Sequence, residues 1–230
     1  MARKKVTRKQ LLKEPDEFLT LSAKTIRWAR ANSRRLGWSL AVILLLAIVF
    51  SAVRFFSARA EARSLVIFNE NKRTYEEILK KDESRQKAYD QVKPSLEALI
   101  KKYSGKSGAK MATVLYANIS YEAGKFDQAI ELYRTALRDY SEEPVLKDLI
   151  VSSLAHAYQG KKEPPPAIKY FQQLADGPPS TMKDEALFNL AAVYQESGNS
   201  AGEKEALQKI VSEHDSSMYA PVAREKLATF

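Results

Sequence analysis

The sequence contains no cysteine, and this absence removes several kinds of chemistry at once. Without a thiol the chain forms no disulfide, holds no thiolate-bound metal and offers no cysteine nucleophile. A lipoprotein anchor, which requires a processed cysteine, is excluded as well. The stability of any folded domain must therefore come from the burial of apolar side chains.

Histidine is nearly as scarce, since the chain has only His156 and His214, which lack the spacing of metal ligands. Gly105-Lys106-Ser107 resembles the end of a phosphate-binding loop, but that pattern needs glycine at position 100, where Ile100 stands. No other group of residues forms a catalytic set. We therefore predict that the protein is not an enzyme and has no cofactor or metal site.

Long apolar runs are absent except for one, Leu36–Val53, which is 18 residues long and carries no charge. As a helix this run reaches about 27 Å, close to the hydrocarbon thickness of a bilayer. Trp38 lies near one end and Phe55-Phe56 near the other, where aromatic rings favour the membrane interface. The sequence predicts a transmembrane helix over residues 36–56.

Two other interpretations of the apolar run stay open. It could be the buried core helix of a soluble protein, although the flanking arginines argue against burial. It could also be a cleaved signal peptide, since Ala58-Arg59-Ala60 has the small-x-small pattern of a cleavage site. The long preceding region and the nearby arginines favour an uncleaved anchor instead.

Basic charge is concentrated before the apolar run. Residues 1–35 hold 11 Lys and Arg against 3 Asp and Glu, a net of +8, whereas residues 36–230 hold 26 against 25. Basic flanks stay in the cytoplasm, so we expect a cytoplasmic N-terminus and a C-terminal domain in the periplasm. The near-balanced remainder gives no reason to expect a nucleic acid partner.

Residues 1–35 are interpreted as a basic cytoplasmic tail with a short interfacial helix. Proline and acids at 14–17 are typical of a helix start. Apolar and basic residues alternate along 18–35, which suits a helix lying on the membrane surface. A plain helical extension of the anchor remains an alternative. Anionic lipid headgroups are the expected partner of the tail, at ~1 kcal/mol per basic residue.

A repeat organises the C-terminal half of the chain. Small residues in the first helices and large ones in the second helices recur at intervals of 38 and then 36 residues. These positions are Ala117, Ala155 and Ala191, and Tyr133, Phe171 and Leu207. Gly124 and Gly198 fall at the expected turns between paired helices. The pattern resembles the tetratricopeptide repeat, a helix–turn–helix unit of roughly 34 residues.

This resemblance implies an all-α fold, with one N-terminal transmembrane helix followed by an α-solenoid of three to four helix pairs and a C-terminal capping helix. Residues 57–109 would form a connecting helix and a degenerate first repeat, and residues 110–230 the repeats and the cap. We expect the helix around Pro94 to begin between Asp90 and Lys93, because proline suits only a first turn. The cap is expected to cover the last repeat with one stripe, formed by Tyr219, Val222, Ala223, Leu227 and Phe230.

Two departures from the repeat pattern are visible. Pro164-Pro165-Pro166 stands where the second repeat should turn, and Glu203 stands where the second helix of the third repeat usually has alanine.

The first helices of such repeats line a concave surface, which we predict to be a partner-binding groove for proteins or extended peptides. The predicted groove residues are Asn118, Tyr121, Glu122, Ser152, His156, Gln159, Phe188, Asn189 and Gln195. They form a mixed aromatic and amide surface. A polar groove residue without a special role is the alternative interpretation of His156.

A basic tail, one anchor and an exported repeat domain together resemble the YfgM-like membrane-anchored tetratricopeptide proteins. That resemblance implies a scaffold or chaperone-like accessory of the bacterial inner membrane, associated with the Sec translocon. A structural adaptor for envelope assembly or cell-division coordination is the alternative function.

Overall fold

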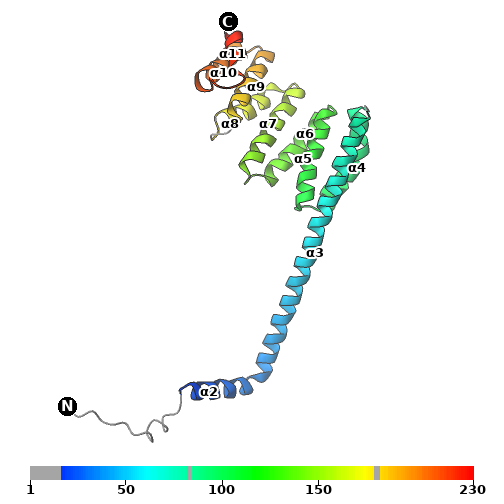
Figure 1. The fold of residues 1–230 in the computed structure, drawn as a ribbon, viewed down its shortest axis with the longest axis vertical. Coiled ribbons are helices and arrows are strands. Elements are labelled where there is room, and N and C mark those ends of the chain that lie inside the picture. Colours follow the sequence, from blue (N-terminus) through cyan, green and yellow to red (C-terminus); the bar gives the residue numbers. More distant parts are fainter. Residues whose placement is uncertain (1–16, 82–83, 179–181) are drawn as a thin grey trace, which may run out of the picture. The chain divides into compact units, whose positions relative to one another are not determined.

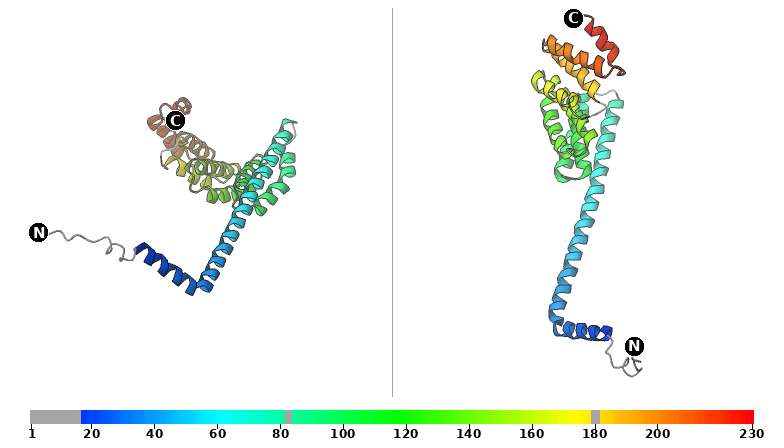
Figure 2. Two further views of the ribbon diagram at one scale, coloured as in Figure 1. Left: turned by 60° about the horizontal axis from the view of Figure 1, so that its bottom comes forward. Right: turned by 90° about the vertical axis from the view of Figure 1, so that its left-hand side faces the viewer.

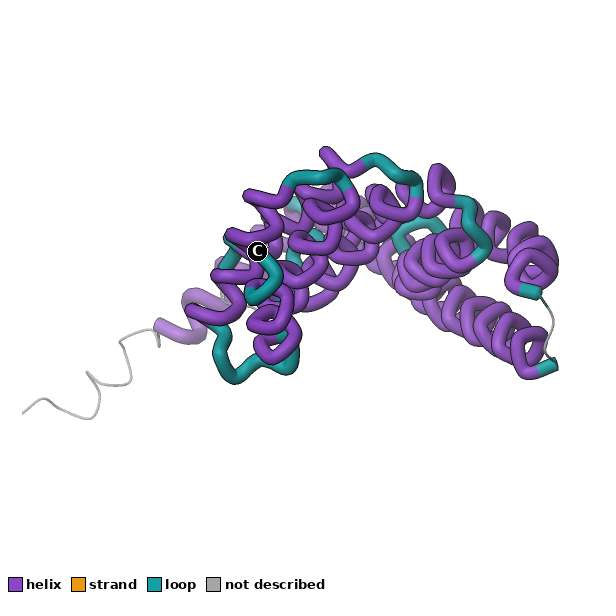
Figure 3. The backbone as a smooth tube through the Cα atoms, turned by 90° about the horizontal axis from the view of Figure 1, so that it is seen from above, coloured by secondary structure: helices purple, strands orange, loops and turns teal. Residues whose placement is uncertain are grey.

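The computed structural model describes residues 17–81, 84–178 and 182–230, and within these ranges the regular structure is entirely helical (Figures 1 and 3). The helices are α2 (Glu17–Ala31), α3 (Ser33–Lys80), α4 (Arg85–Lys102), α5 (Ser107–Glu122), α6 (Phe126–Asp139), α7 (Pro144–Gly160), α8 (Pro164–Ala175), α9 (Lys183–Glu196), α10 (Ser200–Glu213) and α11 (Ala220–Leu227). The chain divides into two units, residues 1–58 and 59–230. The basic segment 1–13 and the helix start expected at 14–16 lie outside the described residues.

The N-terminal unit holds α2 and the first part of α3. Helix α3 is long and apolar enough to span a membrane, and none of its most apolar stretch is buried against protein. Asn32 separates the two helices. The chain changes direction between α2 and α3 (Figures 1 and 2). The carbonyl of Trp28 accepts from both the backbone amide and the side-chain amide of Asn32, at 2.9 Å and 3.0 Å.

The C-terminal unit is a row of helix pairs, α3 with α4, α5 with α6, α7 with α8, and α9 with α10 (Figure 1). From α4 onward each helix packs mainly on its neighbours in sequence. The small residues that define the repeat, such as Ala117 and Ala155, are fully buried, and Phe171 fills the space beside them. These contacts confirm the predicted all-α solenoid.

Helix α3 is joined to α5 at both ends of their contact. The amide of Ser107 donates to the Glu61 carboxylate at 3.0 Å, so a residue of α3 satisfies the start of α5. At the other end the Tyr75 hydroxyl donates to Glu122 at 2.8 Å. Between these bonds, a Cβ on Gly108 would stand 2.3 Å from the backbone of Ser64, so only glycine fits there.

The predicted start of α4, between Asp90 and Lys93, is wrong. The helix begins at Arg85, where the Ser84 side chain accepts from the amide of Lys87 at 3.2 Å, and Pro94 lies inside it. The turns before the proline bury Tyr89 and Val92 against α3 and α5. That burial outweighs the hydrogen bond that proline removes.

The turns within the three later pairs share one backbone conformation. Gly124 and Gly198 have φ of 72° and 74°, and Lys162 has φ of 62° at the equivalent place in the second pair. The run Pro164-Pro165-Pro166, which the sequence placed at this turn, therefore does not form it. Instead Pro164 begins α8, where its missing amide costs no helical hydrogen bond.

The C-terminal end differs in detail from the predicted stripe. Helix α11 buries Ala220 and Ala223, whereas Val222 and Phe230 are exposed, because the eight-residue helix presents only its alanine side to α10. Glu203, at the repeat position usually held by alanine, is buried and pairs with Lys226 of α11 at 3.6 Å.

Candidate functional site

Two neighbouring cavities form one groove along the first helices of the early repeats. The larger has a volume of about 760 Å³ and is lined by α3, α5, the loop before α7, and α7. The smaller, about 350 Å³, is lined by Asn118, Tyr121, Glu122, Tyr133, Ser153 and His156. Asn118 and Ser153 line both cavities, so the two adjoin each other. We call them the apolar end and the polar end of the groove.

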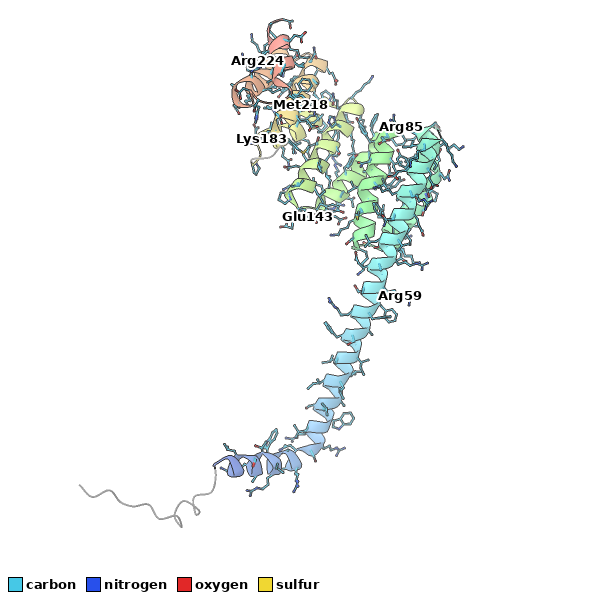
Figure 4. All side chains as sticks on the ribbon, viewed as in Figure 1. Arg59, Arg85, Glu143, Lys183, Met218 and Arg224 are labelled. Atoms are coloured by element: carbon cyan, nitrogen blue, oxygen red, sulfur yellow. The ribbon has the colours of Figure 1, made fainter. Side chains whose placement is uncertain are left out.

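The apolar end presents large aliphatic side chains to solvent. Met111, Leu146 and Leu149 line it and remain 40%, 38% and 47% exposed. The charged lining residues are Lys72, Lys110 and Glu143, the last in the loop that leads into α7 (Figure 4). Exposed aliphatic residues gathered in a concavity are typical of surfaces that bind another molecule.

Sequence reasoning missed these aliphatic residues, although the repeat carried a signal for them. Leu149 follows Met111 by 38 residues and Ser153 follows Leu115 by the same interval, so both pairs occupy equivalent places on the first helices. Extending the period to every residue of those helices would have found them.

The polar end is held in place by hydrogen bonds. The Tyr133 hydroxyl donates to Asn118 Oδ1 at 2.6 Å, and burial raises the pKa of Tyr133, so the hydroxyl keeps its proton. Glu122 accepts from Tyr75 and lies 3.4 Å from Arg85 Nε. The arrangement offers donors and acceptors suited to a peptide backbone.

His156, on α7, is one of the titratable residues that line the polar end. Its ring meets Phe171 edge to face, with 5.0 Å between ring centroids. Burial lowers the pKa of His156 below its usual value, so the imidazole is neutral near pH 7. A neutral imidazole presents one donor and one acceptor to an occupant of the groove.

Four of the predicted groove residues, Asn118, Tyr121, Glu122 and His156, line the polar end together. Ser152 does not, because it is only 7% exposed, and the prediction that it lies open in the groove is wrong. The neighbouring Ser153 lines the groove instead, since one residue along a helix turns the side chain by about 100°.

The other predicted residues do not line these two cavities. Gln159 donates to Glu196 at 2.9 Å, and Gln195 accepts from Lys226 at 2.9 Å. Phe188 stacks on Tyr219, with 4.8 Å between ring centroids, because the segment after α10 returns over it. Asn189 is half-buried. Binding by any of the nine residues stays a prediction.

Among the described residues no three His, Cys, Asp or Glu side chains gather as a metal site. The residues that line the groove offer aliphatic burial at one end and hydrogen bonding at the other.

Comparison with known families agrees with the fold. A tetratricopeptide repeat-like domain model matches residues 27–178, and a tetratricopeptide repeat model matches residues 185–217. The chain belongs to the tetratricopeptide repeat-like family. Tetratricopeptide repeats typically bind proteins or peptides, and the chain is accordingly a protein-interaction scaffold.

Solved structures show the same fold at low identity. A tetratricopeptide repeat protein from Parabacteroides merdae ATCC 43184 is 19% identical, with a TM-score of 0.53, and the match covers 70% of this chain and 59% of that one. A protein from Podospora anserina, assigned as a kinesin light chain with nearly identical TPR-like repeats, is 15% identical, with a TM-score of 0.54. That match covers 74% of this chain and 85% of the other. No curated protein sequence matches the chain.

Proposed function

We propose that this protein is a membrane-tethered scaffold whose groove captures an apolar segment of a partner protein on the periplasmic side. The observation that carries the proposal is the apolar end of the groove, where Met111, Leu146 and Leu149 surround a cavity of about 760 Å³. Fully burying one such side chain contributes about 1.5–3 kcal/mol. A few aliphatic anchors on the partner would supply most of the binding energy.

The two ends of the groove suit different parts of one extended or helical segment. Aliphatic side chains of the partner would occupy the apolar end, and its backbone or polar side chains would meet Asn118, Glu122 and His156. Such a segment is long relative to a metabolite, which agrees with a groove shared between successive repeats.

The tether is the apolar part of α3. Its length and composition suit a membrane span, and the basic residues before it favour a cytoplasmic N-terminus. We place the protein in a bacterial inner membrane. The resemblance to YfgM-like proteins makes the Sec translocon the first partner to test, and an adaptor role in envelope assembly or cell division is the alternative.

Photocrosslinking in the native membrane tests the groove. A photoreactive residue at Ser153, which lines both cavities, should crosslink the partner in the full-length protein. Leu149→Glu should reduce that yield about tenfold, because placing a charge in the apolar end costs roughly 1.4 kcal/mol or more of binding.

Val222→Glu is the matched control, since Val222 is an exposed aliphatic residue on α11 outside the groove. Circular dichroism should show both variants folded. Capture that survives Leu149→Glu, or that falls equally with Val222→Glu, would contradict the proposed groove. The recovered partner decides between a translocon accessory and an assembly adaptor.

A further inference from the structure

We propose that α2 lies in the plane of an anionic membrane leaflet and binds lipid headgroups through its basic side. The inference rests on the proposed tether, because it needs the apolar part of α3 to cross the same membrane. It assigns a lipid surface as the partner of a helix whose large apolar side chains Leu21, Ile26 and Trp28 are exposed.

The first observation is the interruption at Asn32. A helical extension of the anchor would continue without a break, whereas the structure ends α2 at Ala31, turns at Asn32 and begins α3 at Ser33 (Figure 2). The sequence left these two arrangements open. The break favours a separate helix that leaves the direction of the anchor.

The second observation is the division of α2 into two sides. Lys24, Arg27 and Arg30 recur every three residues and project from one side of the helix. Leu21, Ile26 and Trp28 occupy the remaining arc, and all three are more than half exposed. A helix with one basic and one apolar side suits the boundary between headgroups and acyl chains.

The third observation is charge. From residue 18 to residue 60 the chain contains no Asp or Glu, and five Lys and Arg precede the apolar run within that segment. Anionic lipid is the occupant that complements this charge while also burying the apolar side. An acidic protein surface would match the basic side but would leave Leu21 and Trp28 in water.

The two tryptophans of the chain, Trp28 and Trp38, report on this arrangement directly. They are ten residues apart, so in a straight helix Trp28 would stand about 15 Å beyond Trp38 and outside the bilayer. In the proposed arrangement both rings lie at the membrane interface. Trp38→Phe and Trp28→Phe each leave a single reporter.

The experiment reconstitutes the full-length variants in vesicles of phosphatidylcholine with or without phosphatidylglycerol. Part of the phosphatidylcholine carries bromine near the headgroup end of its acyl chains and quenches nearby tryptophan. In anionic vesicles Trp28 should be quenched about as strongly as Trp38, with emission shifted to shorter wavelength. The combined change Lys24→Glu, Arg27→Glu and Arg30→Glu should abolish the quenching of Trp28 and leave that of Trp38.

The matched control reverses three exposed basic residues of the repeat unit, Lys101, Lys169 and Arg224, and should change neither signal. Quenching of Trp38 without quenching of Trp28 would overturn the in-plane position of α2 but would still support α3 as the membrane span. Quenching of neither would overturn the tether too. Trp28 could instead be quenched in neutral vesicles, and in the reversed-charge variant, as strongly as it is in the protein of unchanged charge in anionic vesicles. That result would overturn anionic lipid as the partner.

Discussion

At the scale of single residues, Lys162 is an unfavourable choice for the turn that it occupies. It holds a left-handed backbone conformation that glycine adopts at the equivalent Gly124 and Gly198. A side chain in that conformation costs about 1–2 kcal/mol relative to glycine. Glycine, however, loses more conformational freedom on folding, by roughly 0.5–1 kcal/mol.

Lys162→Gly should therefore raise the free energy of unfolding by about 0.5–1 kcal/mol, measured by urea denaturation. The reciprocal change Gly124→Lys should lower it by a similar amount. If both changes destabilised the protein equally, the turn conformation assigned to the second pair would be wrong.

At the scale of elements, Pro94 limits the stability of α4. Its ring lies on the exposed side of the helix, so it contributes little packing to offset the lost hydrogen bond. Pro94→Ala should raise the free energy of unfolding by about 1–3 kcal/mol, since proline within a helix costs about 3 kcal/mol relative to alanine.

Pro164→Ala is the control for this change, because Pro164 stands at the first position of α8 and should tolerate replacement with little effect. Thermal unfolding followed by circular dichroism measures both variants. Loss of stability in Pro94→Ala would contradict the cost assigned to proline at this position.

The elements show why sequence predicted some features and missed others. Local periodicity was enough to find the helix pairs, because the buried Tyr133, Phe171 and Leu207 recur at intervals of 38 and 36 residues. Pro94 misled the prediction because burial of Val92 lies outside any local rule. Phe188 could not be predicted as covered, since Tyr219 reaches it from a distant segment.

At the scale of the whole molecule, charge asymmetry predicts orientation. The net of +8 in residues 1–35 should keep the N-terminus in the cytoplasm and residues 59–230 in the periplasm. Protease added to spheroplasts should degrade the repeat unit and spare an epitope tag at residue 1. Permeabilised cells, in which both should be degraded, provide the control, and a repeat unit protected in spheroplasts would reverse the orientation.

The neighbour-to-neighbour packing of the helices also bears on how the protein acquires its structure. Helix α5 packs on α3 and α4, which precede it in the chain, and its first amides donate to Glu61 and Ser64 of α3. Helix α11 follows α10 and covers it. Synthesis delivers residues in the same order, at about 5–20 per second. Each helix pair can therefore pack on a pair that has already folded. The growing chain then exposes the apolar packing face of only its most recent pair.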